Sequence, residues 1–142
     1  MSDTLKVCGL TIERGTKLRT YLPVPDTNVK IPLTIINGDQ DGPTLLITAG
    51  IHGGEYPGIA AAMELGRDIE PEHVAGCLIM MHPVNIQGFW ARREMIVPED
   101  GKNLNRVFPG DPMGTLADKT AYLISNNFFS IADFYVDMHS GD

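Results

Sequence analysis

The sequence predicts an α/β fold in which a mostly parallel mixed sheet is flanked by helices. Three short apolar segments, residues 45–48, 76–81 and 133–138, have the length and composition of buried strands. Two longer segments between them, residues 56–69 and 116–131, carry apolar residues at helical spacing. Because strands and helices alternate along the chain, we expect a largely parallel core with right-handed crossovers.

Residues 1–40 are expected to form a β region of the same domain. Residues 10–13 and 18–24 are typical of short extended segments bounded by turn residues. Residues 29–36 alternate between an apolar and a mixed face, which predicts a half-buried strand. Pro32 has no amide hydrogen to donate to a neighbouring strand, so we expect this strand to lie at an edge.

The two helical segments have recognisable beginnings. Pro57 suits the first turn of the helix at 56–69, where an amide hydrogen would have no partner within the helix. Thr115 is a candidate cap for the helix at 116–131, with Asp118 three residues later. The first helix is expected to bury one stripe formed by Ile59, Ala62, Met63 and Gly66.

Residues 84–113 show few periodic signals and predict one long irregular connection. Connections of this length are uncommon in compact domains and are often functional. Within this connection we expect Phe89 and Trp90 to serve in packing rather than to contact a cofactor.

Composition and charge exclude several classes of partner. The 142 residues are 43% hydrophobic, which suits one globular domain. The formal net charge of −7 argues against a general binder of nucleic acids or anionic membranes. The sequence contains no run of about 18 apolar residues, so it predicts no membrane-spanning helix. The amino terminus also lacks a signal-peptide pattern. We therefore expect a cytoplasmic protein.

Three side chains with metal-binding chemistry follow predicted strands. His52 and Glu55 come directly after the first core strand, and His139 follows the third. The carboxyl ends of parallel strands meet at one edge of a sheet, so these groups are expected to converge. Gly53 and Gly54 would allow positive φ angles and close backbone approach in this loop. Two imidazoles and one carboxylate are a common set for hydrolytic zinc and leave one position for water.

Spacing alone leaves an alternative open for each of these residues. A histidine and a glutamate three residues apart occur often by chance, and His139 alone would more often be a packing residue at a strand end.

Three sequence blocks in order then indicate a family. They are GIHGGEYPG at residues 50–58, DGKNLNRVFPG at 100–110 and DMHSG at 137–141. With these blocks the chain resembles the succinylglutamate desuccinylase/aspartoacylase family, relatives of the zinc carboxypeptidases. The resemblance implies a zinc carboxypeptidase-like fold in which residues 41–142 form the N-terminal part of a zinc hydrolase catalytic domain.

The resemblance also implies roles for individual residues. His52, Glu55 and His139 would hold one Zn²⁺ per chain. Asn105 and Arg106 would bind the substrate carboxylate, since a guanidinium offers two parallel donors to a carboxylate. From the residues alone, Arg106 could equally form a surface salt bridge, and Asn105 could be a turn residue.

The sequence allows two interpretations for each of four further residues. Arg92 or Arg93 would contact the substrate or polarise its carbonyl, and Arg92 fits the family pattern slightly better; a solvated loop charge is the alternative for either. Asp137 could orient a ligand histidine or be a plain strand-end acid. His82 is interpreted as a structural residue or a neighbour of the pocket.

The function that the resemblance implies is zinc-dependent hydrolysis of a linear amide, most simply deacylation of an N-acyl amino acid. The family's general-base glutamate lies well after the third metal ligand, whereas this chain ends three residues after His139. The expected catalytic domain is therefore truncated after that ligand, and the base is expected C-terminal to this chain. The expected partner is a small N-acyl amino acid, with a homo-oligomer as a further candidate.

Two alternatives to this function stay open. One is a metallocarboxypeptidase-like peptidase, and the other is a non-catalytic zinc-binding fragment that lacks the base. The sequence does not indicate which acyl group or which amino acid would be used.

Overall fold

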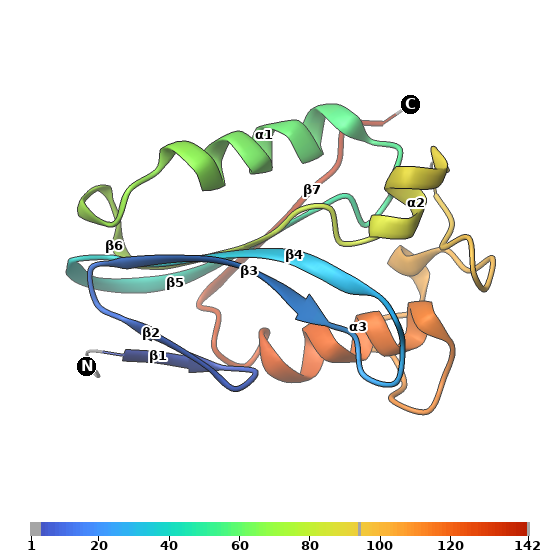
Figure 1. Ribbon diagram of the computed structural model, residues 1–142, viewed down its shortest axis with the longest axis horizontal. Coiled ribbons are helices and arrows are strands. Elements are labelled where there is room, and N and C mark those ends of the chain that lie inside the picture. Colours follow the sequence, from blue (N-terminus) through green and yellow to red (C-terminus); the bar gives the residue numbers. More distant parts are fainter. Residues whose placement is uncertain (1–3, 94, 142) are drawn as a thin grey trace.

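The structure is a computed structural model that describes residues 4–93 and 95–141, and it contains a five-stranded sheet with helices on both faces (Figure 1). The strands are β1 (Thr4–Val7), β2 (Leu10–Glu13), β3 (Thr16–Pro23), β4 (Lys30–Asn37), β5 (Gln40–Ala49), β6 (Ala75–Met81) and β7 (Phe134–Met138). The α-helices are α1 (Tyr56–Asp68), α2 (Ile86–Ala91) and α3 (Leu116–Asn127), and the short 3-10 helices are η1 (Pro71–His73) and η2 (Leu104–Arg106).

The main sheet is mixed, with the strand order β3-β4-β6-β5-β7. β4 pairs antiparallel with both β3 and β6. β5 pairs parallel with β6 on one side and with β7 on the other. These three parallel strands are the three that the sequence predicts, so the α/β fold class is confirmed.

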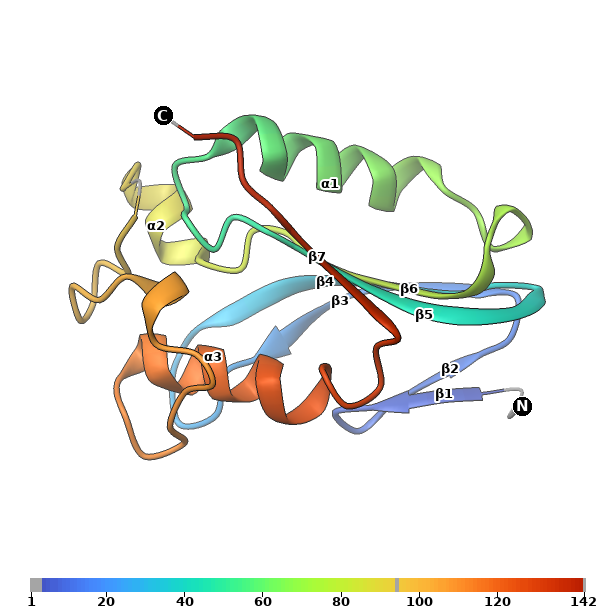
Figure 2. The ribbon, with the colours of Figure 1, turned by 180° about the vertical axis from the view of Figure 1, so that it is seen from behind.

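Each face of the sheet is covered by different elements. α1 lies across one face, whereas α3 and the β1–β2 hairpin lie on the other (Figures 1 and 2). Neighbouring residues of β5 therefore enter different clusters: Leu46 packs in the cluster that contains α3 residues, and Ile47 packs in a separate one. Burial on both faces explains why the core strands appear in the sequence as continuous apolar runs.

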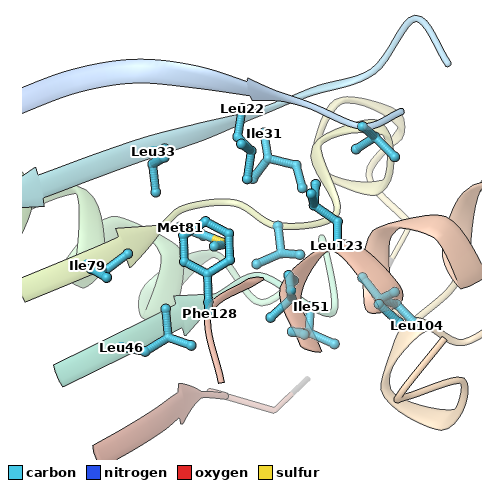
Figure 3. Close-up of a cluster of buried hydrophobic side chains, with 14 of the residues drawn as sticks. Leu22, Ile31, Leu33, Leu46, Ile51, Ile79, Met81, Leu104, Leu123 and Phe128 are labelled. Atoms are coloured by element: carbon cyan, nitrogen blue, oxygen red, sulfur yellow. The ribbon is translucent and has the colours of Figure 1, made fainter. Parts of the chain in front are cut away.

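The largest cluster fills the space between the sheet, α3 and the β1–β2 hairpin (Figure 3). Phe128, the residue that follows α3, is fully buried in this cluster. Burial of such a side chain stabilises a fold by about 1.5–3 kcal/mol relative to leaving it exposed. The cluster includes Leu22, Ile31, Leu33, Leu46, Ile51, Ile79, Met81, Leu104 and Leu123.

The edge position predicted for the strand with Pro32 is wrong. β4 lies between β3 and β6, and its second half is buried on both faces. The register explains why proline is tolerated there: β6 pairs with β4 only from Leu33 onward. Pro32 lies just past the last paired position, where its carbonyl accepts a hydrogen bond from the His82 amide at 3.2 Å.

The predicted helices are confirmed with two corrections. In α1 the buried residues are Gly58, Ile59, Ala62 and Gly66, whereas Met63 is 46% exposed. The second helix ends at Asn127 rather than at residue 131, because the chain turns where Phe128 enters the core. At its start, the Thr115 amide donates to the Asp118 carboxylate at 2.9 Å, as the predicted cap requires.

The long connection at 84–113 is not structureless, which corrects a further expectation. It contains α2 and η2, both too short to produce a periodic signal. Asn85 is the N-cap of α2, and its side-chain oxygen accepts a hydrogen bond from the Gly88 amide at 2.9 Å. Phe89 packs against α1 as expected, but Trp90 is 76% exposed and is not a packing residue. Among the described residues, no helix has both the length and the apolar character needed to cross a membrane.

Candidate metal centre

The loop between β5 and α1 carries the first two candidate ligands. β5 ends at Ala49, and Glu55 directly precedes the first residue of α1. Gly50 has a φ of +72°, whereas neither Gly53 nor Gly54 has a positive φ, contrary to expectation. The close backbone approach expected at this loop is present at Gly53, because a Cβ atom there would lie 2.5 Å from the carbonyl carbon of Gly88 in α2.

The strand pairing brings the third candidate ligand to the same place. Ala49 at the end of β5 is the register partner of Met138 at the end of β7, so His139 emerges beside the β5–α1 loop. The ligand atoms of His52, Glu55 and His139 all lie within 4.8 Å of one another. The convergence that the sheet topology predicts is therefore present in the structure.

Both imidazole rings direct the same nitrogen toward Glu55. His52 Nδ1 lies 2.9 Å from Glu55 Oε1, and His139 Nδ1 lies 3.0 Å from Glu55 Oε2. His52 and Glu55 are buried, whereas the His139 side chain keeps 32% of its surface exposed. Two imidazole nitrogens and a carboxylate fit a single divalent ion and leave an open side toward solvent.

The same contacts shift the acid–base properties of the site. Burial raises the pKa of Glu55, but the hydrogen bonds from His52 and the Ser140 amide outweigh it and leave this pKa lowered. Burial lowers the pKa of His139, but its contacts with Asp137 and Glu55 outweigh that effect and leave this pKa raised. The carboxylate is thus ionised at neutral pH, which is the state that a metal ligand requires.

The second nitrogen of each ring has its own partner. His139 Nε2 lies 2.7 Å from Asp137 Oδ2, and His52 Nε2 lies 3.1 Å from Asn103 Oδ1. Such outer partners fix the orientation and the tautomer of a ligand histidine. Of the two interpretations left open for Asp137, the structure therefore favours the one in which it orients His139.

Two hydroxyl groups, those of the buried Thr48 and the more exposed Tyr135, hold Asp137 in turn. The Thr48 hydroxyl donates to Asp137 Oδ1 at 2.8 Å, so it must accept its other contact, from the Tyr135 hydroxyl at 2.8 Å. Burial raises the pKa of Tyr135 to about 12, and this phenol therefore keeps its proton. Sequence reasoning did not single out Thr48, because its partners lie on a strand 87 and 89 residues away.

The predicted substrate contacts occupy two different positions. Asn105 lies in η2 and lines a hollow that also contains Asp137, so it is close to the metal centre. Arg106 follows it and is exposed. Arg92 ends α2 in the left-handed conformation and lines a separate hollow with Tyr56, the residue next to Glu55. Arg93 is exposed as well, and His82 is buried under α1 as a structural residue.

The family model described as the succinylglutamate desuccinylase/aspartoacylase catalytic domain matches residues 41–142. The chain belongs to this family.

Relatives within the succinylglutamate desuccinylase/aspartoacylase family agree with the assignment. The N-alpha-acetyl-L-2,4-diaminobutyric acid deacetylase of Halomonas elongata is 40% identical over 128 residues, which cover 85% of this chain and 37% of that protein. The solved structure of a succinylglutamate desuccinylase/aspartoacylase from Rhodobacter sphaeroides has 35% identity and a TM-score of 0.83, covering 98% of this chain and 44% of that one.

A second solved structure is the product-bound ectoine utilization protein EutE (DoeB) from Ruegeria pomeroyi. It has 34% identity and a TM-score of 0.85, covering 99% of this chain and 44% of its own. The chain thus spans less than half the length of each of these three proteins.

Proposed function

We propose that this chain is the N-terminal part of a zinc-dependent hydrolase that removes the acyl group from an N-acyl amino acid. The observation that carries the proposal is the convergence of His52, Glu55 and His139 at one edge of the sheet. Membership of the succinylglutamate desuccinylase/aspartoacylase family supports the reaction class. We assign residues 1–40 to the same domain, because β3 and β4 pair within the sheet that carries the site.

His52, Glu55 and His139 would hold the ion, with Nδ1 of each ring facing it. When bound, zinc acts as a Lewis acid that polarises the acyl carbonyl and makes a water molecule more acidic. The protein keeps Glu55 ionised through its hydrogen bonds to His52 and Ser140, so the ion meets a charged ligand. Asp137 holds the His139 ring so that Nδ1 is directed inward.

Asn105 and Arg106 are proposed to bind the carboxylate of the amino-acid part. Asn105 lines the hollow that also contains Asp137. The guanidinium of the exposed Arg106 lies 3.5 Å from the Asn105 carbonyl oxygen. A planar guanidinium and an amide together offer three donors to one carboxylate. Arg92 is proposed as a second substrate contact from the far side of the β5–α1 loop, where it lies beside Tyr56.

The amino acid is proposed to carry a short, positively charged side chain. This choice rests on the Halomonas relative, which is named for an N-acetylated diaminobutyric acid. The general base is proposed to be a glutamate that follows residue 142 in a longer protein, because both oxygens of Asp137 are already engaged by Thr48 and His139.

Metal binding by the chain is the first test. We expect about one zinc ion per purified chain by elemental analysis, and we expect His52→Ala to lose the ion because one of three ligands is removed. His73→Ala is a matched control, since this histidine is exposed in η1 and away from the site. A His52→Ala protein that retains as much zinc as the His73→Ala protein would refute the assignment.

Activity is tested in the longer protein. We expect chelator-sensitive release of acetate from N-α-acetyl-diaminobutyrate. Arg106→Ala should raise KM by about tenfold or more, because a charged hydrogen bond to the substrate contributes about 1.5–3 kcal/mol. A longer protein that binds zinc yet hydrolyses no N-acyl amino acid would favour the non-catalytic alternative.

A further inference from the structure

Asn103 lies between the metal centre and the turn that carries the proposed substrate contacts. It is half-buried and directly precedes η2. Its side-chain oxygen has two neighbours: His52 Nε2 at 3.1 Å and the backbone nitrogen of Asn105 at 2.9 Å. One atom thus contacts both a candidate metal ligand and the backbone of a candidate substrate-binding residue.

The contact with Asn105 determines which way the Asn103 amide is turned. A backbone N–H can only donate, so the atom that faces it must be the amide oxygen rather than the amide nitrogen. The same oxygen faces His52 Nε2, and this ring nitrogen must therefore carry the hydrogen. Nδ1, which faces Glu55, is then the nitrogen whose lone pair is available to an ion.

We propose that Asn103 is a positioning residue that holds His52 with Nδ1 toward the metal ion and fastens η2 to the same centre. The proposal rests on the proposed function, because it needs an ion bound by His52. The two ligand histidines then have outer partners of different charge, a neutral amide for His52 and a carboxylate for His139. Asn103 differs from Asp137 in a second way, because it also anchors the segment that carries Asn105 and Arg106.

Two substitutions distinguish the role of the Asn103 side-chain oxygen from that of its amide nitrogen. Asn103→Ala removes the oxygen that both His52 and Asn105 contact. Asn103→Asp keeps an acceptor at the same distance from the backbone and replaces the amide nitrogen with a second oxygen. Asn126→Ala is the matched control, since Asn126 is an exposed asparagine on α3.

The first measurement is zinc affinity by chelator competition on the 142-residue chain. We expect Asn103→Ala to bind zinc about 10–100-fold more weakly than wild type, the usual effect of removing an outer partner of a ligand histidine. We expect Asn103→Asp to restore the affinity to within about threefold of wild type, and Asn126→Ala to match wild type. The acid keeps an acceptor for both His52 and the Asn105 amide, so its rescue would show that the site requires the oxygen of Asn103 rather than its amide nitrogen.

The second measurement is NMR of the histidine ring nitrogens in the zinc-loaded wild-type chain, which needs no variant to fold. We expect His52 to bind through Nδ1 and to carry its hydrogen on Nε2. In the longer protein, Asn103→Ala should also raise KM, because η2 loses its anchor to the metal centre.

Two outcomes would overturn the proposal: Asn103→Ala with wild-type zinc affinity, or zinc bound through Nε2 of His52. Either would leave the proposed function intact. Failure of the wild-type chain to bind zinc would instead refute the metal centre itself, and the role of Asn103 with it.

Discussion

At the scale of single residues, the histidines of this chain differ in what surrounds each ring. His52 and His139 have acceptors on both nitrogens, supplied by Glu55, Asn103 and Asp137. His82 is as buried as His52, whereas His139 is exposed. Among the described residues, the hydrogen-bond partner of the His82 ring is the neutral hydroxyl of Thr34, 3.2 Å from Nε2. Burial disfavours the charged form of both His82 and His139, and at His139 the contacts with Asp137 and Glu55 outweigh it.

His82 predicts a pH dependence of stability. Burial lowers its pKa in the folded state, so below pH about 6.5 the unfolded chain binds more protons than the folded one. The free energy of unfolding should therefore decrease as the pH falls below about 6.5, by at most about 1.4 kcal/mol per unit for one group. His82→Asn removes this contribution and should show a shallower decrease.

Urea unfolding of both proteins at a series of pH values between about 5 and 8 measures this difference. Contributions from the other titrating groups are common to both proteins and cancel. Parallel curves for wild type and His82→Asn would show that the buried ring does not control stability.

At the scale of elements, the candidate metal centre depends on how two short segments pack against each other. The β5–α1 loop presses against α2 at Gly53, where a Cβ atom would meet the backbone of Gly88 and Phe89. Gly58, five residues later in α1, is buried too, but a Cβ there would make an ordinary contact at 3.4 Å with the Met138 carbonyl. Two glycines of the same sequence block thus have different steric requirements.

This difference predicts opposite effects for two alanine substitutions. Gly53→Ala should lower the free energy of unfolding by about 1–3 kcal/mol, because backbone atoms must move apart. It should also weaken zinc binding, since the displaced loop carries His52. Gly58→Ala should be neutral or stabilise by up to about 1 kcal/mol, because alanine favours the helix over glycine.

Urea unfolding and zinc affinity of the two variants test the packing argument. A Gly53→Ala protein that folds and binds zinc as well as Gly58→Ala would contradict this steric requirement.

At the scale of the whole molecule, the sheet ends in an open edge next to the metal centre. Among the described residues, β7 pairs with β5 only. Phe134, Tyr135 and Val136 of β7 are between 41% and 63% exposed. A strand edge with unpaired backbone groups and apolar side chains is a surface on which another strand can add.

We therefore predict concentration-dependent self-association of the 142-residue chain through β7. Val136→Lys should reduce it, because a charged side chain at a strand edge disfavours edge-to-edge pairing. Met113→Lys is the control, since Met113 is 88% exposed but lies outside the sheet. Light scattering after gel filtration gives the molar mass; a chain that is monomeric at every concentration would contradict the prediction.

Much of the candidate site could be predicted from local patterns. His52, Glu55 and His139 each follow a strand with a continuous apolar run, and parallel pairing of those strands brings their carboxyl ends together. Pro32 shows where such reasoning fails. Its missing amide hydrogen is tolerated because β6 ends just before it, and the length of a neighbouring strand is not visible in the sequence around the proline.

The sequence by itself determined the order of the main strands and helices, the two loops that carry the candidate ligands and the family, because these depend on residue type and spacing along the chain. Only the tertiary structure showed that Asn103 and Asp137 hold the ligand rings and that Thr48 holds Asp137. The physical reason is that a hydrogen bond depends on distance and direction in space. Residues up to 89 positions apart become partners only once the sheet has formed.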